Sequence, residues 1–282
     1  MLFDTHAHYD DEAFDTDREA VLAAMPEKNV GLIVNPGCTV ETSRQAVALA
    51  ERFDHVYAAV GIHPENCGDF TDADMDILRT LAQHDKVVAI GEIGLDYYWE
   101  ENPSRAWQQH VLRAQMALAE ELGLPVIIHD REAHADTLAI VREFSQVKGV
   151  FHCYSGSVED ARTLLKMGWM LSFNGAVTFK NARKAPEVIA ATPIERMMIE
   201  TDSPYLTPVP YRGKRNDSGY VHLVAEKIAE IKHMTPQEVE RITFENGKRF
   251  SVFFERQQIF RRNGRNRRPF LCALLPNRET CL

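Results

Sequence analysis

The sequence predicts an α/β protein, a (β/α)8 TIM barrel in a single domain over residues 1–250. Eight short apolar runs recur along the chain, each bounded by glycine, proline or polar residues and too brief to be a helix. Helix-like segments lie between them, and alternating strands and helices imply a parallel sheet with right-handed crossovers. Because eight such units fit within 282 residues, a closed barrel is favoured over an open sheet.

The apolar runs give the expected strands. They start 20 to 39 residues apart, which leaves room for a crossover helix after each one. The strands are predicted at Leu2–Asp4, Gly31–Asn35, Val56–Ile62, Val87–Ile90, Val126–Ile128, Val150–Phe151, Met170–Phe173 and Met197–Ile199.

Helices are predicted from apolar spacing and from residues that begin or end them. Gly123 is placed to end the longest helix, and Thr235-Pro236-Gln237-Glu238 is a capping box with proline at the first helical position. The crossover helices are predicted at Thr16–Glu27, Val40–Phe53, Ser104–Leu122, Glu132–Phe144, Val158–Met167 and Pro186–Ala191, and two more follow the eighth strand at Tyr220–Lys232 and Thr235–Phe250.

Charge separates the last segment from the rest of the chain. The net charge is -9, but residues 251–282 hold seven Arg and two Glu, so they carry +5 and residues 1–250 carry -14. An acidic body argues against broad electrostatic binding of duplex nucleic acid, although it allows a local basic loop. Residues 251–282 also lose the periodic pattern, so we expect them to be a disordered or out-of-frame extension. A genuine basic arm for nucleic acid is the alternative.

Cysteine use and the absence of targeting signals suggest a cytoplasmic protein. The five cysteines form no Cys-x-x-Cys pair, and an odd number is a poor disulfide framework. No basic and apolar leader opens the chain, and no apolar run approaches the ~20 residues that span a bilayer. Neither a membrane nor an obligate protein partner is predicted.

Polar residues with metal-binding chemistry follow the strands. His6 and His8 are two residues apart, so on a strand they would face the same side. Alone, such a pair could be two solvent-facing histidines near the terminus. The full set is harder to explain as core filling, because buried charges are costly unless paired or metal-bound. The predicted ligands are His6, His8, Glu92, His129, His152 and Asp202.

Six ligands are too many for one tetrahedral site and suit two divalent ions, which could be Zn²⁺, Mn²⁺ or Mg²⁺. Glu92 follows the fourth strand, opposite the first in an eight-strand ring, and is the best bridge. We expect His6, His8 and Asp202 to share one ion with Glu92, and His129 and His152 to share the other. Glu92, Asp202 and His63, which ends the third strand, are the predicted catalytic residues, with His63 handling substrate or protons.

Anion-binding residues are predicted beside this site. Arg131 follows a predicted ligand, and the basic loop after the eighth strand contains Arg212, Lys214 and Arg215, where barrel enzymes often bind phosphate. Aromatic residues near strand ends could stack on bases or simply pack the rim. They are Tyr97, Tyr98, Trp99, Tyr154, Tyr205 and Tyr211, of which Tyr154 is included among the predicted substrate-binding residues.

These motifs together resemble the TatD family of metal-dependent hydrolases, in the amidohydrolase superfamily, and its YcfH-type bacterial branch in particular. The matching stretches are Asp4–His8, Gly61–Pro64, Gly91–Asp96, Pro125–His129, Phe151–Gly156, Glu200–Leu206 and Arg212–Asn216. The resemblance implies the same barrel and the same six ligands. It also implies deoxyribonuclease activity, often 3′ to 5′ on single strands, or activity on D-aminoacyl-tRNA esters. Members that resemble this chain end soon after the position of Phe250.

Three functions remain open from the sequence. A metal-dependent phosphodiesterase acting on single-stranded DNA is favoured by the two expected ions, the basic loop and the rim aromatics. Hydrolysis of an amide, lactone or carboxylic ester is the alternative, but such relatives commonly place a modified lysine at the fourth strand, where this chain has Glu92. A non-catalytic binding barrel is disfavoured by the intact ligand set.

Overall fold

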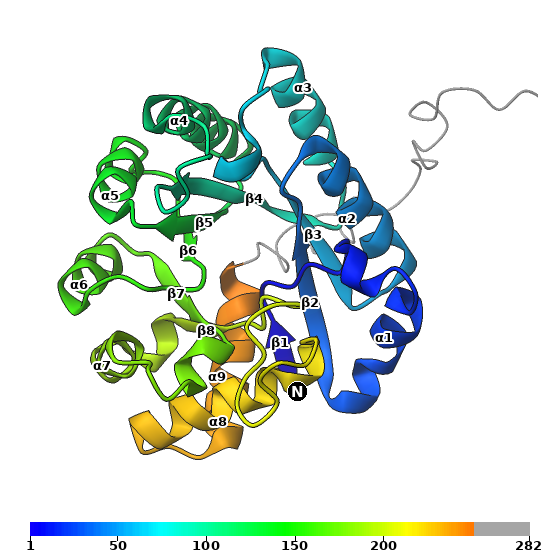
Figure 1. Ribbon diagram of the computed structural model, residues 1–282, viewed down its shortest axis with the longest axis vertical. Coiled ribbons are helices and arrows are strands. Elements are labelled where there is room, and N and C mark those ends of the chain that lie inside the picture. Colours follow the sequence, from blue (N-terminus) through cyan, green and yellow to red (C-terminus); the bar gives the residue numbers. More distant parts are fainter. Residues whose placement is uncertain (251–282) are drawn as a thin grey trace, which may run out of the picture.

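The computed structural model describes residues 1–250, and the predicted separate segment 251–282 lies outside the described residues. Eight strands are all parallel and neighbour one another in chain order, which confirms the predicted barrel. Figure 1 looks onto this ring, with the helices outside it. The strands are β1 (Leu2–Asp4), β2 (Val30–Pro36), β3 (Val56–Val60), β4 (Val87–Asp96), β5 (Val126–Arg131), β6 (Gly149–Phe151), β7 (Met170–Phe173) and β8 (Met197–Ile199).

The helices match the predicted ones with one exception. They are α1 (Arg18–Ala24), α2 (Val40–Arg52), α3 (Asp72–Leu81), α4 (Arg105–Leu122), α5 (His134–Glu143), α6 (Val158–Lys166), α7 (Lys184–Ala191), α8 (Val221–Lys232) and α9 (Pro236–Phe250). The sequence analysis assigned no helix between β3 and β4, and α3 corrects this. Its signal was a capping box, in which the amide and hydroxyl of Thr71 both donate to Asp74, at 2.8 and 2.9 Å.

The barrel closes where the segments after β1 and β8 meet. Ala7 and Ser203 form an isolated parallel bridge, and the amide of Asp202 donates to the carbonyl of His6 at 2.9 Å. Because β1 ends at Asp4, His6 and His8 lie in the extended segment beyond the strand rather than within it. Chain closure therefore brings residues from the two ends of the barrel to one place.

Strand β4 runs six residues further than predicted and contains Glu92 instead of ending before it. Its pairing with β5 shifts register between Ile90 and Ile93. Ile90 pairs with Val126 and Ile93 pairs with Ile128, so β4 has one more residue than β5 over this interval. An extra residue of this kind bends a strand and redirects side chains. This bulge accounts for the position of Glu92, whose side chain is almost fully buried within the ring.

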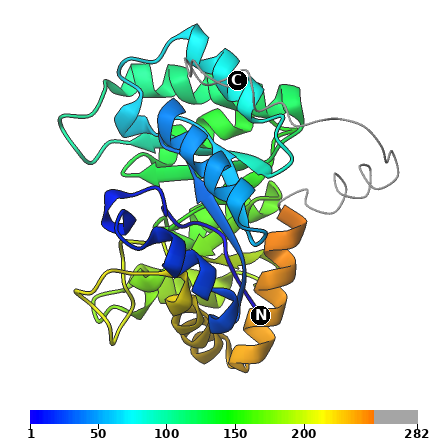
Figure 2. The same cartoon turned by 90° about the vertical axis from the view of Figure 1, so that its right-hand side faces the viewer.

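A second cluster of buried side chains fills the inside of the barrel. It takes residues from seven of the eight strands, whereas the larger cluster lies between strands and helices. Helix α9 closes the amino-terminal end of the ring, with Phe244 packed edge-on against Phe3 at a ring-centroid distance of 6.1 Å. In Figure 2, α9 lies along one edge and the loops after β4 and β8 project from the opposite edge.

The carboxyl ends of the strands thus form one open face. Among residues 1–250, no helix combines the length and the apolar character needed to cross a bilayer.

Gly94, two residues after Glu92, lies where the backbones of β4 and β5 pack closely, and its replacement tests this packing. Its φ is +154°, and an added Cβ would overlap the carbonyl of His129. We expect Gly94→Ala to lower the free energy of unfolding by about 3 kcal/mol or more, since it adds both strain and overlap. Gly123→Ala is the control, because Gly123 also has a positive φ (+62°) but has open space around it. This variant should lower the free energy of unfolding by only about 1 kcal/mol. Urea denaturation measures both, and equal losses would contradict this account.

Candidate metal centre

The candidate site is built around the carboxylate of Glu92, which is only 3% exposed and lies inside the open face of the barrel. Its two oxygens face different groups of side chains. Oε2 faces residues that follow β1, and Oε1 faces His129 within β5 and residues that follow β3 and β6. This division decides how the predicted ligands are grouped.

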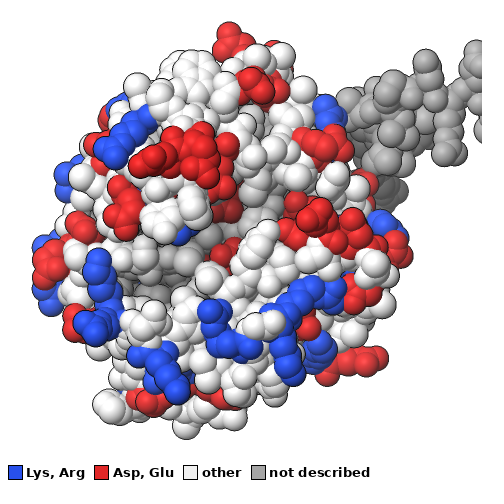
Figure 3. Space-filling view, viewed as in Figure 1, with Lys and Arg blue, Asp and Glu red and all other residues white. Residues whose placement is uncertain are grey.

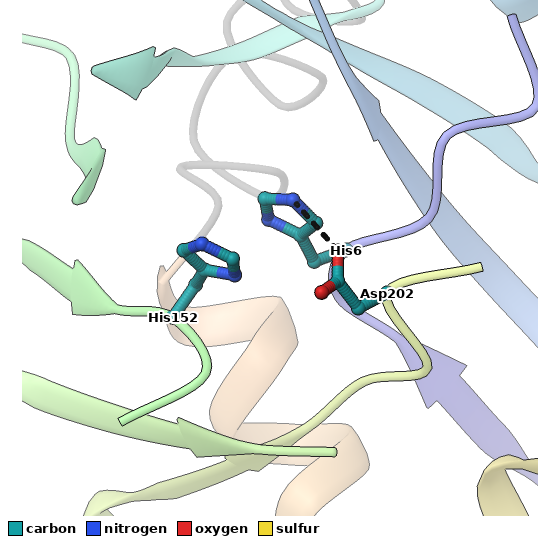
Figure 4. Close-up of side chains that lie close together, drawn as sticks. All are labelled: His6, His152 and Asp202. Carbon is teal, nitrogen blue, oxygen red and sulfur yellow. Dashed lines mark ion pairs between the residues drawn. The ribbon is translucent and has the colours of Figure 1, made fainter. Parts of the chain in front are cut away.

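The first group gathers at Oε2 of Glu92. The Nε2 atoms of His6 and His8 lie 3.1 and 3.5 Å from this oxygen, and 3.0 Å from each other. Oδ1 of Asp202 lies 3.8 Å from His6 Nε2 and 3.7 Å from His8 Nε2. Figure 4 shows Asp202 pointing toward His6 from the segment after β8, with the His152 ring beside them.

The second group gathers at Oε1 of Glu92. His152 Nε2 lies 2.7 Å and His129 Nδ1 2.9 Å from this oxygen, and the two nitrogens lie 3.4 Å apart. His63 joins this group with Nε2 at 3.5 Å. The rings of His6 and His152 stack 4.0 Å apart and connect the two groups.

The shorter of these distances are those of direct hydrogen bonds, and the longer ones also match the spacing of donor atoms around one cation. Bonds of ~2.1 Å place two ligand atoms of one ion roughly 3–3.5 Å apart. Three combinations of side chains bring their donor atoms within 4.8 Å of one another: His6, His152 and Asp202; His6, His8 and Glu92; and His63, Glu92 and His129. The structure therefore brings all six predicted ligands together, and adds His63 as a neighbour. Their metal-binding role stays a prediction.

Electrostatics keeps Glu92 ionised in this buried place. Burial alone would raise the pKa of Glu92, but the charges of His152, His6 and His63 and a hydrogen bond from His129 lower it well below its ordinary value. An ionised carboxylate is the form that binds a cation, and cations compete with protons for such a site.

His63 differs from the other histidines around Glu92 in that a backbone amide fixes its tautomer. Its Nδ1 accepts a hydrogen bond from the amide of Glu65 at 3.2 Å, so a neutral ring carries its proton on Nε2, facing Glu92. Burial, with the charge of His129 acting in the same direction, lowers the pKa of His63 to about 4. His63 is therefore a neutral donor that points into the site.

Two further carboxylates orient the ligands, and sequence analysis assigned neither a role. Asp96 accepts from His129 Nε2 at 3.0 Å, so the two nitrogens of this ring face Asp96 and Glu92. Glu200 lies 3.4 Å from His152 Nδ1 and accepts from the amide of Cys153. Both lie in stretches that carry a predicted ligand, Asp96 four residues after Glu92 and Glu200 two residues before Asp202, and this closeness in the sequence was the available signal. Such outer carboxylates fix ring orientation at metal sites.

The predicted substrate-binding residues differ in their freedom to reach a ligand. Tyr154 is buried, and its hydroxyl donates to the carbonyl of Ser157 at 2.9 Å. Arg215 is held by Asp17 through two hydrogen bonds of 2.8 and 2.7 Å. Arg212 lies over the ring of Phe179 at 3.9 Å and makes no hydrogen bond or ion pair with another described residue.

Exposed charges are divided across the open face. Figure 3 shows a central hollow with basic side chains along one side and acidic ones along much of the rest. On the segments that directly follow β7 and β8, the exposed basic residues that form no ion pair with another described residue are Lys180, Arg183, Lys184, Arg212 and Lys214, which we name the basic rim. Arg215 is also exposed there but is paired with Asp17. On the segments after β3 and β4, the exposed acidic residues include Glu65, Asp69, Glu100 and Glu101.

Comparison with known proteins gives one consistent result. Residues 3–251 match the family model described as TatD related DNase. The chain is 49% identical to the metal-dependent hydrolase YabD of Bacillus subtilis, over 88% of this chain and 98% of that one, and 38% identical to the metal-dependent hydrolase YcfH of Escherichia coli K12, over 93% and 100%. The crystal structure of YjjV, a TatD homologue from Escherichia coli K12, superposes with a TM-score of 0.84 and 30% identity, covering 89% of this chain and 97% of that one.

The outer carboxylates yield a test. Asp96→Asn keeps the shape of the side chain but removes the charge that faces His129 Nε2, so we expect metal affinity to fall by about 10–100-fold. Asp130→Asn is the matched control, because Asp130 lies on the neighbouring strand β5 but pairs with His134 at 2.8 Å. This variant should leave metal affinity unchanged. Titration of metal-free protein against a fluorescent chelator measures both. Equal affinities in the two variants would refute the orienting role of Asp96.

Proposed function

The chain belongs to the TatD family of metal-dependent hydrolases, and on that premise we propose that it is a phosphodiesterase that uses two divalent ions to cleave single-stranded DNA. The observation that carries the proposal is the division of donors between the two oxygens of Glu92, with Nε2 of His6 at 3.1 Å from one and Nε2 of His152 at 2.7 Å from the other. A carboxylate shared in this way is the usual bridge between paired ions.

Residues on both sides of Glu92 would hold the ions. His6, His8 and Asp202 would bind one together with Glu92, and His129 and His152 would bind the other with the same carboxylate. Imidazole and carboxylate donors suit Zn²⁺ and Mn²⁺, and Mg²⁺ less well because it prefers oxygen. The bound pair supplies a water of lowered pKa and positive charge next to the scissile phosphate.

The side chains of the protein have separate tasks in this proposal. Asp202 is the more exposed of the two catalytic carboxylates, at 16% against 3% for Glu92, so it can accept a proton from the attacking water. His63 donates from Nε2 to a phosphate oxygen, since its tautomer is fixed by Glu65. Arg212 and Lys214 of the basic rim hold neighbouring phosphates.

A phosphodiester is favoured over a carboxylic ester or an amide by charge. A carboxylic ester or amide that is not attached to a nucleic acid needs no basic surface, whereas each nucleotide of DNA brings a negative phosphate to the site. The basic rim lies on an otherwise acidic body, which suits a single strand crossing the open face and not a duplex spread over the surface.

The proposal predicts cleavage of single-stranded DNA that depends on metal and on Glu92. The experiment uses 3′-labelled and 5′-labelled strands with Zn²⁺, Mn²⁺, Mg²⁺ or EDTA, and compares wild type with Glu92→Ala. We expect shortened products with at least one metal, none in EDTA, and a loss of at least about a hundredfold in the variant. If no metal supports cleavage while aminoacyl esters or amides are hydrolysed, the phosphodiesterase proposal is wrong.

The sharing of Glu92 predicts a difference in metal stoichiometry. Glu92→Gln should weaken both ions, whereas Asp202→Asn should weaken only the ion on the His6 side. After equilibration with Mn²⁺ and gel filtration, elemental analysis should give two ions per chain for wild type, one for Asp202→Asn and fewer than one for Glu92→Gln. Two ions retained by Glu92→Gln would exclude the bridging role.

A further inference from the structure

We infer that Tyr98, Trp99 and Arg131 form a stacking subsite that binds one unpaired nucleobase beside the metal centre. This inference rests on the proposed function and refines it, because it assigns a place to a base as well as to the phosphate. The three residues, which we name the stacking platform, come from the loop after β4 and from the last position of β5.

Unusual exposure is the first argument. Tyr98 is 50% and Trp99 44% exposed, although large aromatic side chains are normally buried on folding. Of the five aromatic residues that are exposed in the described part of the chain, four lie on the loops after β4 and β8, with Tyr205 and Tyr211 on the second loop. Aromatic groups exposed at the mouth of a site mark a surface that a ligand covers.

The internal geometry of the platform is the second argument. The guanidinium of Arg131 lies 3.8 Å from the centre of the Tyr98 ring and 5.4 Å from that of Trp99, and the two rings meet edge to face at 4.7 Å. Within residues 1–250, this guanidinium makes no hydrogen bond or ion pair, and its charge acts on the nearby carboxylates of Asp96 and Glu65. A planar cation held by rings at one face keeps its N–H groups for a ligand at its edge.

The platform is fixed relative to the metal ligands, which is the third argument. The amide of Tyr98 donates to Asp96 Oδ1 at 2.9 Å, while the other oxygen of Asp96 holds His129. Asn102 donates to the carbonyl of Asp96, and the amide of Tyr97 donates to the carbonyl of Arg131 at 3.0 Å. Asp96 therefore ties the aromatic loop and a ligand ring together, so a base on the platform would have a defined position relative to the scissile bond.

Charge indicates that the platform receives a base and not a phosphate. Glu100 and Glu101 are exposed directly after Trp99, and they would repel a phosphate. The basic rim lies on the other side of the hollow, where the backbone of the strand would run (Figure 3). A base can reach from that side to the platform only if it is unpaired, which gives the site a physical reason to prefer single strands over duplexes.

The test compares an ordinary oligonucleotide with one that carries abasic residues. We expect Trp99→Ala to raise KM for the ordinary strand roughly five- to a hundredfold, as for the loss of one stacked base, and to leave KM for the abasic strand unchanged. Trp99→Phe should restore most of the loss because it retains a stacking ring. An equal effect of Trp99→Ala on both strands would show that the change acts through the loop and would overturn the inference.

A binding measurement in EDTA separates this inference from the proposed function. The variant Trp107→Phe removes the other exposed tryptophan, and the third tryptophan, Trp169, is fully buried. In this variant, quenching of tryptophan fluorescence by a bound strand therefore reports contact with Trp99. The ordinary strand should quench it and the abasic strand should not. Equal quenching by both would reject the stacking platform, whereas quenching without cleavage in any metal would reject the phosphodiesterase proposal alone.

Discussion

The arrangement of the open face depends on one buried charge, the carboxylate of Glu92 among five imidazole rings. A carboxylate that is 3% exposed would be strongly destabilising without compensation. Here His152 and His129 lie within 2.9 Å of one oxygen, and His6 lies 3.1 Å from the other. The surrounding imidazoles make ionised Glu92 tolerable in this buried place, and they hold its pKa well below the ordinary value.

The barrel supplies this cluster by several local devices and not by a single motif. The bulge in β4 turns Glu92 inward, and the bridge between Ala7 and Ser203 joins the chain ends that carry His6 and Asp202. Asp96 then serves two purposes, because one oxygen orients His129 and the other fixes the aromatic loop. The proposed metal centre and the proposed stacking platform thereby share one strand end.

The sequence predicted most of this because strand periodicity and strand-end chemistry are local properties. It placed the eight strands, and the structure brings the six predicted side chains together around Glu92, while their division between two ions stays a prediction. It missed α3 because the polar first turn of that helix, beginning at Asp72, weakened the apolar signal. It also gave no role to Asp96 and Glu200, and did not foresee that Tyr154 would be buried and Arg215 held by Asp17, because partners in space cannot be read from spacing along the chain.

The central claim is that Glu92 stands between two metal ions, and anomalous diffraction from crystals equilibrated with Mn²⁺ or Zn²⁺ tests it most directly. The account predicts two anomalous peaks about 3.5–4 Å apart, one beside His6 and His8 and one beside His129 and His152, with a Glu92 oxygen directed at each. A single peak, or a pair in which Glu92 contacts only one ion, would contradict it.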